Sequence, residues 1–164
     1  MKKIALLFTI ISFAIASQLP SEAQKAGFNG IWTLDRSKSV LVEDSPALTK
    51  INVKIKGDSL LTERTYVGGD GQEYPFTENV TLDGRVYNIT IYDMPRKTKA
   101  TWSDQDGTLI VESTTTYNGD SGQENFISKE SWKADIVNKT LTINYKNSTP
   151  EGEVTGVFVF TKSE

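Results

Sequence analysis

The fold is decided by the stretch Phe28-Asn29-Gly30-Ile31-Trp32-Thr33-Leu34-Asp35-Arg36-Ser37-Lys38-Ser39. Every second residue from Phe28 to Leu34 is apolar or glycine, and the positions between them are polar except Ile31, which is the pattern of a half-buried strand. A glycine two residues before a tryptophan also lets another backbone come close beside the large ring. The stretch therefore predicts the opening strand of a sheet that closes onto Trp32.

The chain begins with the features of an export signal. Met1-Lys2-Lys3 is followed by an apolar run over 4–16 and by small residues at Ser21 and Ala23, so cleavage is expected after Ala23. The apolar run is shorter than the roughly 20 residues that span a bilayer. We therefore expect residues 1–23 to be a signal peptide and 24–164 to be one domain, exported from a bacterial cell and soluble in the periplasm or outside the cell.

Composition excludes several classes of function. The chain has a net charge of −3, and the sequence has no basic stripe with interleaved aromatic residues, so nucleic acid is not an expected partner. It has no cysteine, which excludes disulfides, and no histidine, which excludes histidine-based triads and histidine-ligated zinc or haem. The Asp-Gly loops at Asp70 and Asp120 lack calcium-ligand spacing. We therefore expect no metal and no cofactor.

Short alternating runs separated by turn residues fill the rest of the chain. Asp83-Gly84 predicts a two-residue hairpin, and Met94-Pro95-Arg96 predicts a turn. The segment 40–48 is expected to be a loop that covers one end of the fold. After the opening strand, the predicted strands are 51–56, 60–67, 74–82, 85–92, 97–103, 108–117, 123–135, 139–145 and 154–161.

This layout predicts an all-β protein. An open sheet of so many strands would leave two long unprotected edges, whereas closure removes them. We therefore expect an antiparallel up-and-down barrel of about 8–10 strands. A two-sheet sandwich is the alternative, although it usually requires a long Greek-key connection.

The opening strand carries a family resemblance. Gly30-Ile31-Trp32 resembles the Gly-x-Trp motif of the lipocalin and calycin group, and the stretch from Gly30 to Ser39 resembles the start of small exported bacterial lipocalin-like proteins. The resemblance implies that Trp32 closes the base of a barrel beside Gly30. It also implies that a basic residue from the last strand packs over the ring, for which Lys162 is the candidate. The chain differs from typical lipocalins in having no disulfide and shorter, more numerous strands.

The inward faces of several predicted strands mix polar with aromatic residues. On 108–117 this face carries Ser113 and Thr115, and on 123–135 it carries Phe126 and Ser128. Such a mixture is typical of a cavity that binds a ligand, which we expect at the end opposite Trp32. The candidate ligand-binding residues are Arg64, Tyr66, Glu78, Trp102, Tyr117, Glu130 and Trp132.

These observations predict a binding protein for a small apolar or amphipathic molecule. One alternative is an interaction or structural module with a filled barrel and no ligand. A second alternative is an enzyme that uses carboxylates such as Glu78 and Glu130, but nothing in the sequence indicates that they converge as a glycosidase pair must. We therefore expect no enzymatic activity and name no catalytic residue.

Overall fold

The computed structural model describes residues 22–43, 45–103, 106–119 and 122–163, and within them ten antiparallel strands form one sheet. The spatial order is β4-β3-β2-β1-β10-β9-β8-β7-β6-β5. The strands are β1 (Gly30–Leu34), β2 (Ala47–Lys56), β3 (Ser59–Val67), β4 (Glu73–Thr81), β5 (Tyr87–Ile91), β6 (Met94–Trp102), β7 (Leu109–Gly119), β8 (Gly122–Asp135), β9 (Thr140–Thr149) and β10 (Gly152–Lys162).

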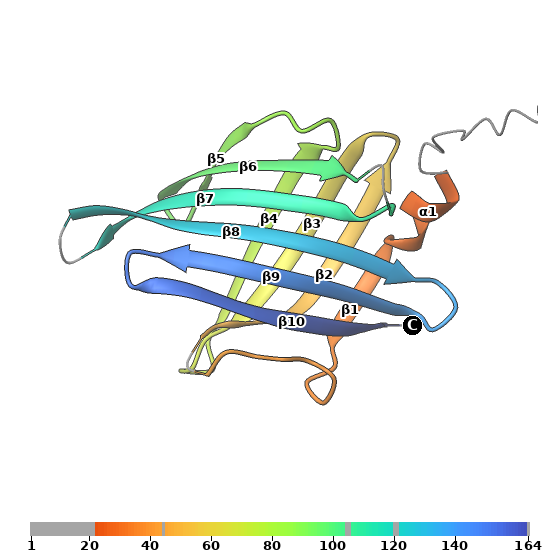
Figure 1. Cartoon of the computed structure of the whole chain (residues 1–164), viewed down its shortest axis with the longest axis horizontal. Helices are drawn as coiled ribbons and strands as arrows, with labels where there is room; N and C mark the ends of the chain where they lie inside the picture. The colour runs from red at the N-terminus through yellow and green to blue at the C-terminus, as the bar shows by residue number, and fades with distance from the viewer. Residues whose placement is uncertain (1–21, 44, 104–105, 120–121, 164) are drawn as a thin grey trace, which may run out of the picture.

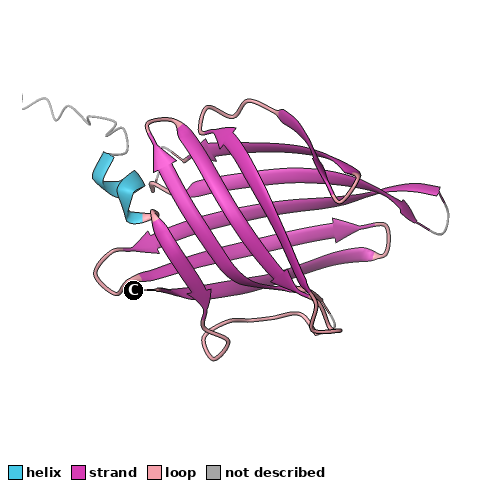
Figure 2. Ribbon diagram, turned by 180° about the vertical axis from the view of Figure 1, so that it is seen from behind, coloured by secondary structure: helices cyan, strands magenta, loops and turns pink. Residues whose placement is uncertain are grey.

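The sheet curls into a nearly closed up-and-down barrel, which confirms the predicted fold class. Strands β5 to β10 run across one side, and β1 to β4 cross behind them at an angle (Figure 1). The view from behind brings β1 to β4 to the front (Figure 2). Every strand pairs with its sequence neighbour, except across the gap between β4 and β5, and β1 pairs with β10.

The seam of the barrel lies between β4 and β5, and here the predicted Asp83-Gly84 hairpin is wrong. The two strands are the two ends of the sheet, so the residues that join them cross the seam instead of turning within a hairpin. Asp83 forms an isolated bridge with Thr101 of β6, and the backbone N–H of Gly84 donates to the carbonyl of Ala100 at 2.9 Å. The Thr81 and Tyr87 hydroxyls meet across the same gap at 2.9 Å. Backbone pairing therefore closes only one end of the seam.

The base of the barrel is built around Trp32. Its side chain is 1% exposed, and its Nε1–H donates to the carbonyl of Phe28 at 2.8 Å. Lys162 is paired with Trp32 in the β1–β10 ladder, and its Nζ lies 5.2 Å from the centroid of the Trp32 ring. Gly30 has a positive φ of 136°, and a Cβ there would lie 2.5 Å from Lys162 Cε. The glycine thus makes room for the lysine stem beside the ring.

A short helix, α1 (Glu22–Gly27), lies beside this base and is not predicted by the sequence pattern. Lys25 pairs with Asp58 at 3.1 Å, which ties the helix to the β2–β3 turn. The predicted signal peptide lies outside the described residues apart from Glu22 and Ala23. Within the described part of the chain, no helix has the length and apolar character needed to cross a membrane.

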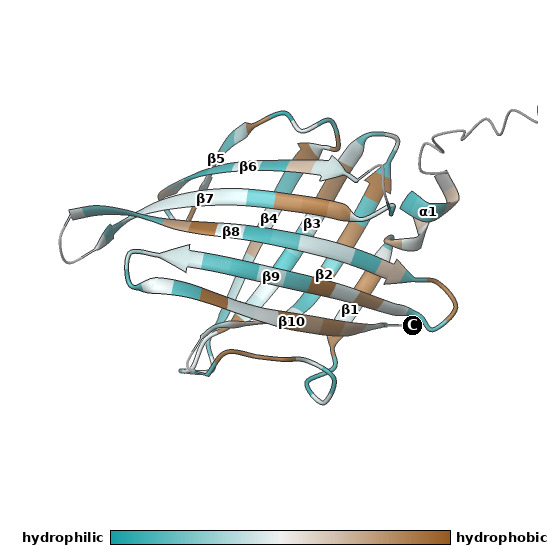
Figure 3. Ribbon diagram, viewed as in Figure 1, coloured by the Kyte–Doolittle hydropathy of each residue, from teal (hydrophilic) through white to brown (hydrophobic). Residues whose placement is uncertain are grey.

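The apolar core fills the half of the barrel next to α1. Side chains buried there include Ile51, Leu109, Leu141, Ile143 and Phe160. In Figure 3, β7 is brown near its start and becomes white to teal toward its far end. Beyond the core, the inward positions therefore change from aliphatic to polar and aromatic residues, and the candidate site begins there.

Candidate functional site

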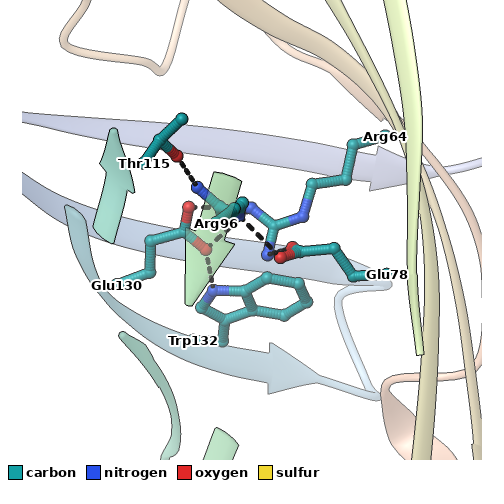
Figure 4. Close-up of polar contacts among 6 residues, drawn as sticks. All are labelled: Arg64, Glu78, Arg96, Thr115, Glu130 and Trp132. Atoms are coloured by element: carbon teal, nitrogen blue, oxygen red, sulfur yellow. Dashed lines mark hydrogen bonds and ion pairs between the residues drawn. The ribbon is translucent and has the colours of Figure 1, made fainter. Parts of the chain in front are cut away.

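Arg64 of β3 is the centre of a buried ion network (Figure 4). It is 2% exposed, and its Nη1 donates to Glu130 Oε1 at 2.8 Å and to Oε2 at 3.0 Å. Its Nη2 lies 3.4 Å from Glu78 Oε2. A buried guanidinium requires such partners, because an unpaired charge loses its hydration without compensation. Arg64 therefore joins two carboxylates that are far apart in the sequence.

Trp132 contacts both members of the Arg64–Glu130 ion pair. Its Nε1–H donates to Glu130 Oε2 at 2.8 Å, and the Arg64 guanidinium lies over its ring at 5.0 Å from the centroid. Glu130 and Trp132 are two positions apart on β8 and therefore both face inward, so this one strand supplies the carboxylate and the ring. The Glu130 carboxylate thus accepts hydrogen bonds on both oxygens.

Arg96 of β6 extends the network across the barrel seam. Its Nε–H donates to Glu78 Oε1 of β4 at 2.9 Å, and its Nη1–H donates to Thr115 Oγ1 of β7 at 3.0 Å. The ring of Phe76 lies 5.7 Å from its guanidinium carbon. Because β4 does not form a ladder with β5 or β6, this ion pair takes the place of backbone hydrogen bonds in the middle of the seam.

The network contains two guanidinium groups and two carboxylates, so its charges balance. Burial would raise the pKa of Glu78, but Arg64 and Arg96 outweigh this effect and hold the pKa below its ordinary value. Burial disfavours the charged form of Arg64, whereas Glu130 and Glu78 raise its pKa above the ordinary value. Arg64 and Glu78 are therefore both ionised at neutral pH.

A cavity of about 730 Å³ lies above this network, at the end of the barrel opposite Trp32. This volume is in the range of small-molecule sites, which is about 300–1,000 Å³. Its walls are mainly aromatic and aliphatic, and Arg96 and Glu130 lie at its floor. The principal apolar lining residues are Val42, Tyr66, Phe76, Ile91, Met94, Tyr117, Phe126, Tyr145 and Phe158.

Two stacked aromatic pairs line the cavity, one on β3 and β4 and the other on β9 and β10. Tyr66 stacks on Phe76 with ring centroids 5.8 Å apart, and Tyr145 stacks on Phe158 at 4.6 Å. Burial, followed by the charge of Glu130, raises the pKa of Tyr66 to about 12. Gly156 makes room for the second pair, since a Cβ there would lie 2.3 Å from the Tyr145 hydroxyl. These rings present flat apolar surfaces to the cavity.

The mouth of the cavity is formed by loops and by strand ends. Val42, Ser45 and Pro46 line it, so the segment predicted to cover one end of the fold lies at this end. The exposed rings of Tyr74 and Tyr92 meet edge to face, with centroids 6.3 Å apart. The Tyr92 hydroxyl also donates to the carbonyl of Pro75. This contact joins the β5–β6 turn to β4 where the seam reaches the mouth.

The structure places the sequence-predicted site residues in three groups. Tyr66, Tyr117 and Glu130 line the cavity. Arg64, Glu78 and Trp132 form the buried layer beneath it, outside its lining. The third group is Trp102 alone.

Trp102 lies apart from the other predicted ligand-binding residues and outside the cavity lining. Trp102 shares the inward face of β6 with Arg96, but it is the last residue of the strand. Its ring therefore packs edge to face on Phe28, with centroids 5.5 Å apart, at the base of the barrel.

Sequence reasoning missed Arg96, because Met94-Pro95-Arg96 was predicted to be a turn. The turn is instead at Tyr92 and Asp93, which have positive φ values of 49° and 64°, and β6 begins at Met94. The signal that could have found Arg96 is the alternation of inward residues along β6, which continues through Thr98 and Ala100.

The acidic loops give no indication of a metal site in the residues that the structure describes. No cluster of three or more potential metal-ligating side chains is found there. Asp70 accepts hydrogen bonds from the backbone N–H of Gln72 at 3.0 Å and from the Tyr74 hydroxyl at 3.2 Å, which is ordinary turn chemistry. Asp120 lies outside the described residues.

Comparison with known proteins adds no assignment. No protein-family model matches the chain, and no curated protein matches it at a significant level. The function is therefore inferred from the geometry of the barrel interior.

Proposed function

We propose that this protein is an exported lipocalin-like binding protein that holds a small apolar or amphipathic molecule in the open half of its barrel. The observation that carries the proposal is the cavity of about 730 Å³ opposite Trp32, which has aromatic walls and a charged floor. Ligand sites typically combine a mostly apolar lining with a few polar groups that orient the ligand.

The two halves of the interior would have separate roles. The half next to α1 is filled by side chains, and the network around Arg64 separates it from the cavity. A ligand would therefore enter only as far as the layer formed by Arg96 and Glu130. Its apolar body would lie between the Tyr66–Phe76 and Tyr145–Phe158 stacks.

Two observations support the lipocalin-like and exported parts of the proposal. Lys162 lies over the ring of Trp32, beside Gly30, as in the barrel closure that the family resemblance implies. The sequence at residues 1–23 has the charged, apolar and small-residue regions of a signal peptide. N-terminal sequencing of the protein isolated from its host would test the second point, and a chain that still begins at Met1 would contradict it.

Binding can be tested with a neutral fluorescent probe, N-phenyl-1-naphthylamine, together with native mass spectrometry of protein purified from its host. We expect the probe to become brighter in the cavity and a host molecule to co-purify with the protein.

A matched pair of variants locates the site. Val154→Trp places a large ring in the cavity lining, whereas Thr155→Trp places it on the outer face of the same strand. The first variant should weaken probe binding at least about tenfold, because the ring takes up space that the probe needs. The second should leave binding unchanged. A protein that binds neither the probe nor any host molecule would overturn the proposal.

The alternative of an interaction module rests on Tyr74 and Tyr92, which are partly exposed at the mouth. Both rings line the cavity, so the same pair also suits an entrance. A partner captured by the wild-type protein and lost in a Tyr92→Ala variant, with no probe binding in either, would favour this alternative.

Binding rather than catalysis is proposed, because Glu78 and Glu130 are both engaged by Arg64 and only Glu130 lines the cavity.

A further inference from the structure

We infer that the bound molecule is an anion whose carboxylate is held by Arg96, with the hydroxyl groups of Thr115 and Ser128 as additional donors. The inference rests on the proposed binding function and specifies the chemical class of the ligand. The three side chains come from the neighbouring strands β6, β7 and β8, and all three line the cavity. Arg96 is paired directly with Thr115 in the β6–β7 ladder.

The first argument is that Glu130, the carboxylate that lines the cavity, is already engaged on both oxygens. Glu130 accepts from Arg64 on both oxygens and from Trp132 on Oε2. Glu78 accepts from Arg96 on Oε1, its Oε2 lies 3.4 Å from Arg64 Nη2 without a hydrogen bond, and the residue lies outside the cavity lining. A cationic ligand would have to displace Arg64 from Glu130, which would leave a buried guanidinium without its closest partner. The floor is therefore poorly suited to an ammonium group.

The second argument is that the cavity lining still has hydrogen-bond donors without an acceptor. A guanidinium has five N–H groups, and Arg96 uses one at Nε and one at Nη1 within the described residues, so Nη2 stays available. The Oγ1 of Thr115 accepts from Arg96, which leaves its own hydrogen free to donate. Among the described residues, Ser128 Oγ has no hydrogen-bond partner, and Ser128 lines the cavity. This surplus of donors matches a carboxylate, since an Arg–carboxylate pair is among the strongest hydrogen-bonded contacts in proteins.

Arg64 is the basic residue among the ligand-binding candidates predicted from the sequence, but it is not available to bind the ligand carboxylate. Both of its Nη atoms are engaged by carboxylates, its Nε is buried without a partner, and it does not line the cavity. The Glu151 and Glu153 side chains at the rim oppose an incoming anion only weakly. They are exposed, and Glu153 pairs with Lys146 at 2.8 Å. Rim charges of this kind mainly change the association rate.

The test is isothermal titration calorimetry with three probes of similar size: 2-naphthylacetate, 2-(2-naphthyl)ethanol and 2-(2-naphthyl)ethylammonium. At neutral pH and constant ionic strength, we expect the acid to bind at least about tenfold more tightly than the alcohol, and the ammonium to bind most weakly. An ammonium that binds most tightly, or an acid that binds no better than the alcohol, would overturn the inference.

Two variants place the carboxylate in the cavity. Arg96→Gln should reduce the preference for the acid over the alcohol to less than about threefold. Since this change also removes a seam contact, Ser128→Ala provides a second test that leaves the ion network intact. It should lower the affinity for the acid about three- to tenfold. Ser113→Ala is its control, because Ser113 is the inward residue paired with Ser128 but does not line the cavity, and it should have no effect. Full acid preference in both Arg96→Gln and Ser128→Ala would refute the inference.

The two proposals fail in different ways. If the alcohol binds and the acid has no advantage, the binding function stands and the inference about the carboxylate is wrong. If none of the three probes binds, the inference is wrong, and the binding function is overturned as well only if N-phenyl-1-naphthylamine and host molecules also fail to bind.

Discussion

Replacing Arg64 by methionine removes the charge that joins the two buried carboxylates. Glu78 would keep Arg96 as a partner at 2.9 Å, but Glu130 would retain only the Trp132 Nε1–H at 2.8 Å. Glu130 is 6% exposed, so hydration from the cavity could replace only part of the lost ion pair. Breaking a buried pair in this way costs about 3–5 kcal/mol of unfolding free energy.

The assay is urea denaturation followed by far-ultraviolet circular dichroism. With a dependence of about 2 kcal/mol per molar urea, a loss of about 4 kcal/mol lowers the midpoint by about 2 M. The informative comparison is the double variant Arg64→Met/Glu130→Met, which leaves the Glu78–Arg96 pair balanced. We expect the double variant to be more stable than Arg64→Met alone, since a similar volume is retained and no buried charge is orphaned.

Lys99→Met provides the control for removing a cation from an ion pair at the surface. Lys99 Nζ lies 2.8 Å from Glu112 Oε2 on the outer face, where an exposed pair contributes below about 1 kcal/mol. If Arg64→Met costs no more than Lys99→Met, or if the double variant is less stable than Arg64→Met, the buried network does not have the energetic role described.

Three further predictions concern the plug and the titrating groups. Trp32→Ala should lower the free energy of unfolding by about 3–5 kcal/mol in the same urea assay, whereas exposed Ile31→Ala should lower it by less than about 1 kcal/mol, and equal costs would contradict the plug assignment. Since the folded-state pKa of Glu78 is below its ordinary 4.5, its contribution to stability is full above pH 4.5 and is lost as the pH falls through the folded value. Glu78→Gln should therefore show a shallower loss of stability in acid, and a loss as steep as that of the wild type would refute this. The pKa of Tyr66 is raised from 10.0 to about 12, so stability should fall as the pH rises through that interval, and tyrosinate absorbance should lose its highest-pH transition in Tyr66→Phe.

The barrel could be predicted from the sequence because the signals for strands and turns lie within short segments of the chain. Alternation places Leu109, Val111, Ser113 and Thr115 on one face of a strand whatever its neighbours are, and those residues are buried in the structure. Glycine turns such as Gly57-Asp58 then fix most of the strand order through hairpins. Fold class and inward faces could therefore be derived without knowledge of tertiary contacts.

The site could be predicted only in part, since it depends on which strands meet across the barrel. Alternation identified Arg64, Glu78 and Glu130 as inward candidates, but nothing local indicates that one guanidinium bridges both carboxylates. The position of the seam was not predictable either, because Asp83-Gly84 has hairpin chemistry and yet crosses an unpaired gap. Arg96 was not predicted to face inward, because it follows Pro95 and a proline normally indicates a turn or a strand start.

The pairing of β1 with β10 has a consequence for how the chain folds. It is the one ladder in the described sheet whose strands are not consecutive in sequence, and the hydroxyls of Thr33 and Ser163 meet there although they are 130 residues apart. All other ladders join strands that are consecutive in sequence, through short turns except for the connection 35–46 between β1 and β2. Each of β1–β4 and β5–β10 can therefore form as a local meander at a lower cost in loop entropy than the joining of the two. Joining the two meanders at β1 and β10 requires the longest loop closure in the sheet, and contacts of this kind slow folding. The strand that carries the Trp32 plug is thus also the strand through which the two meanders of the barrel are joined.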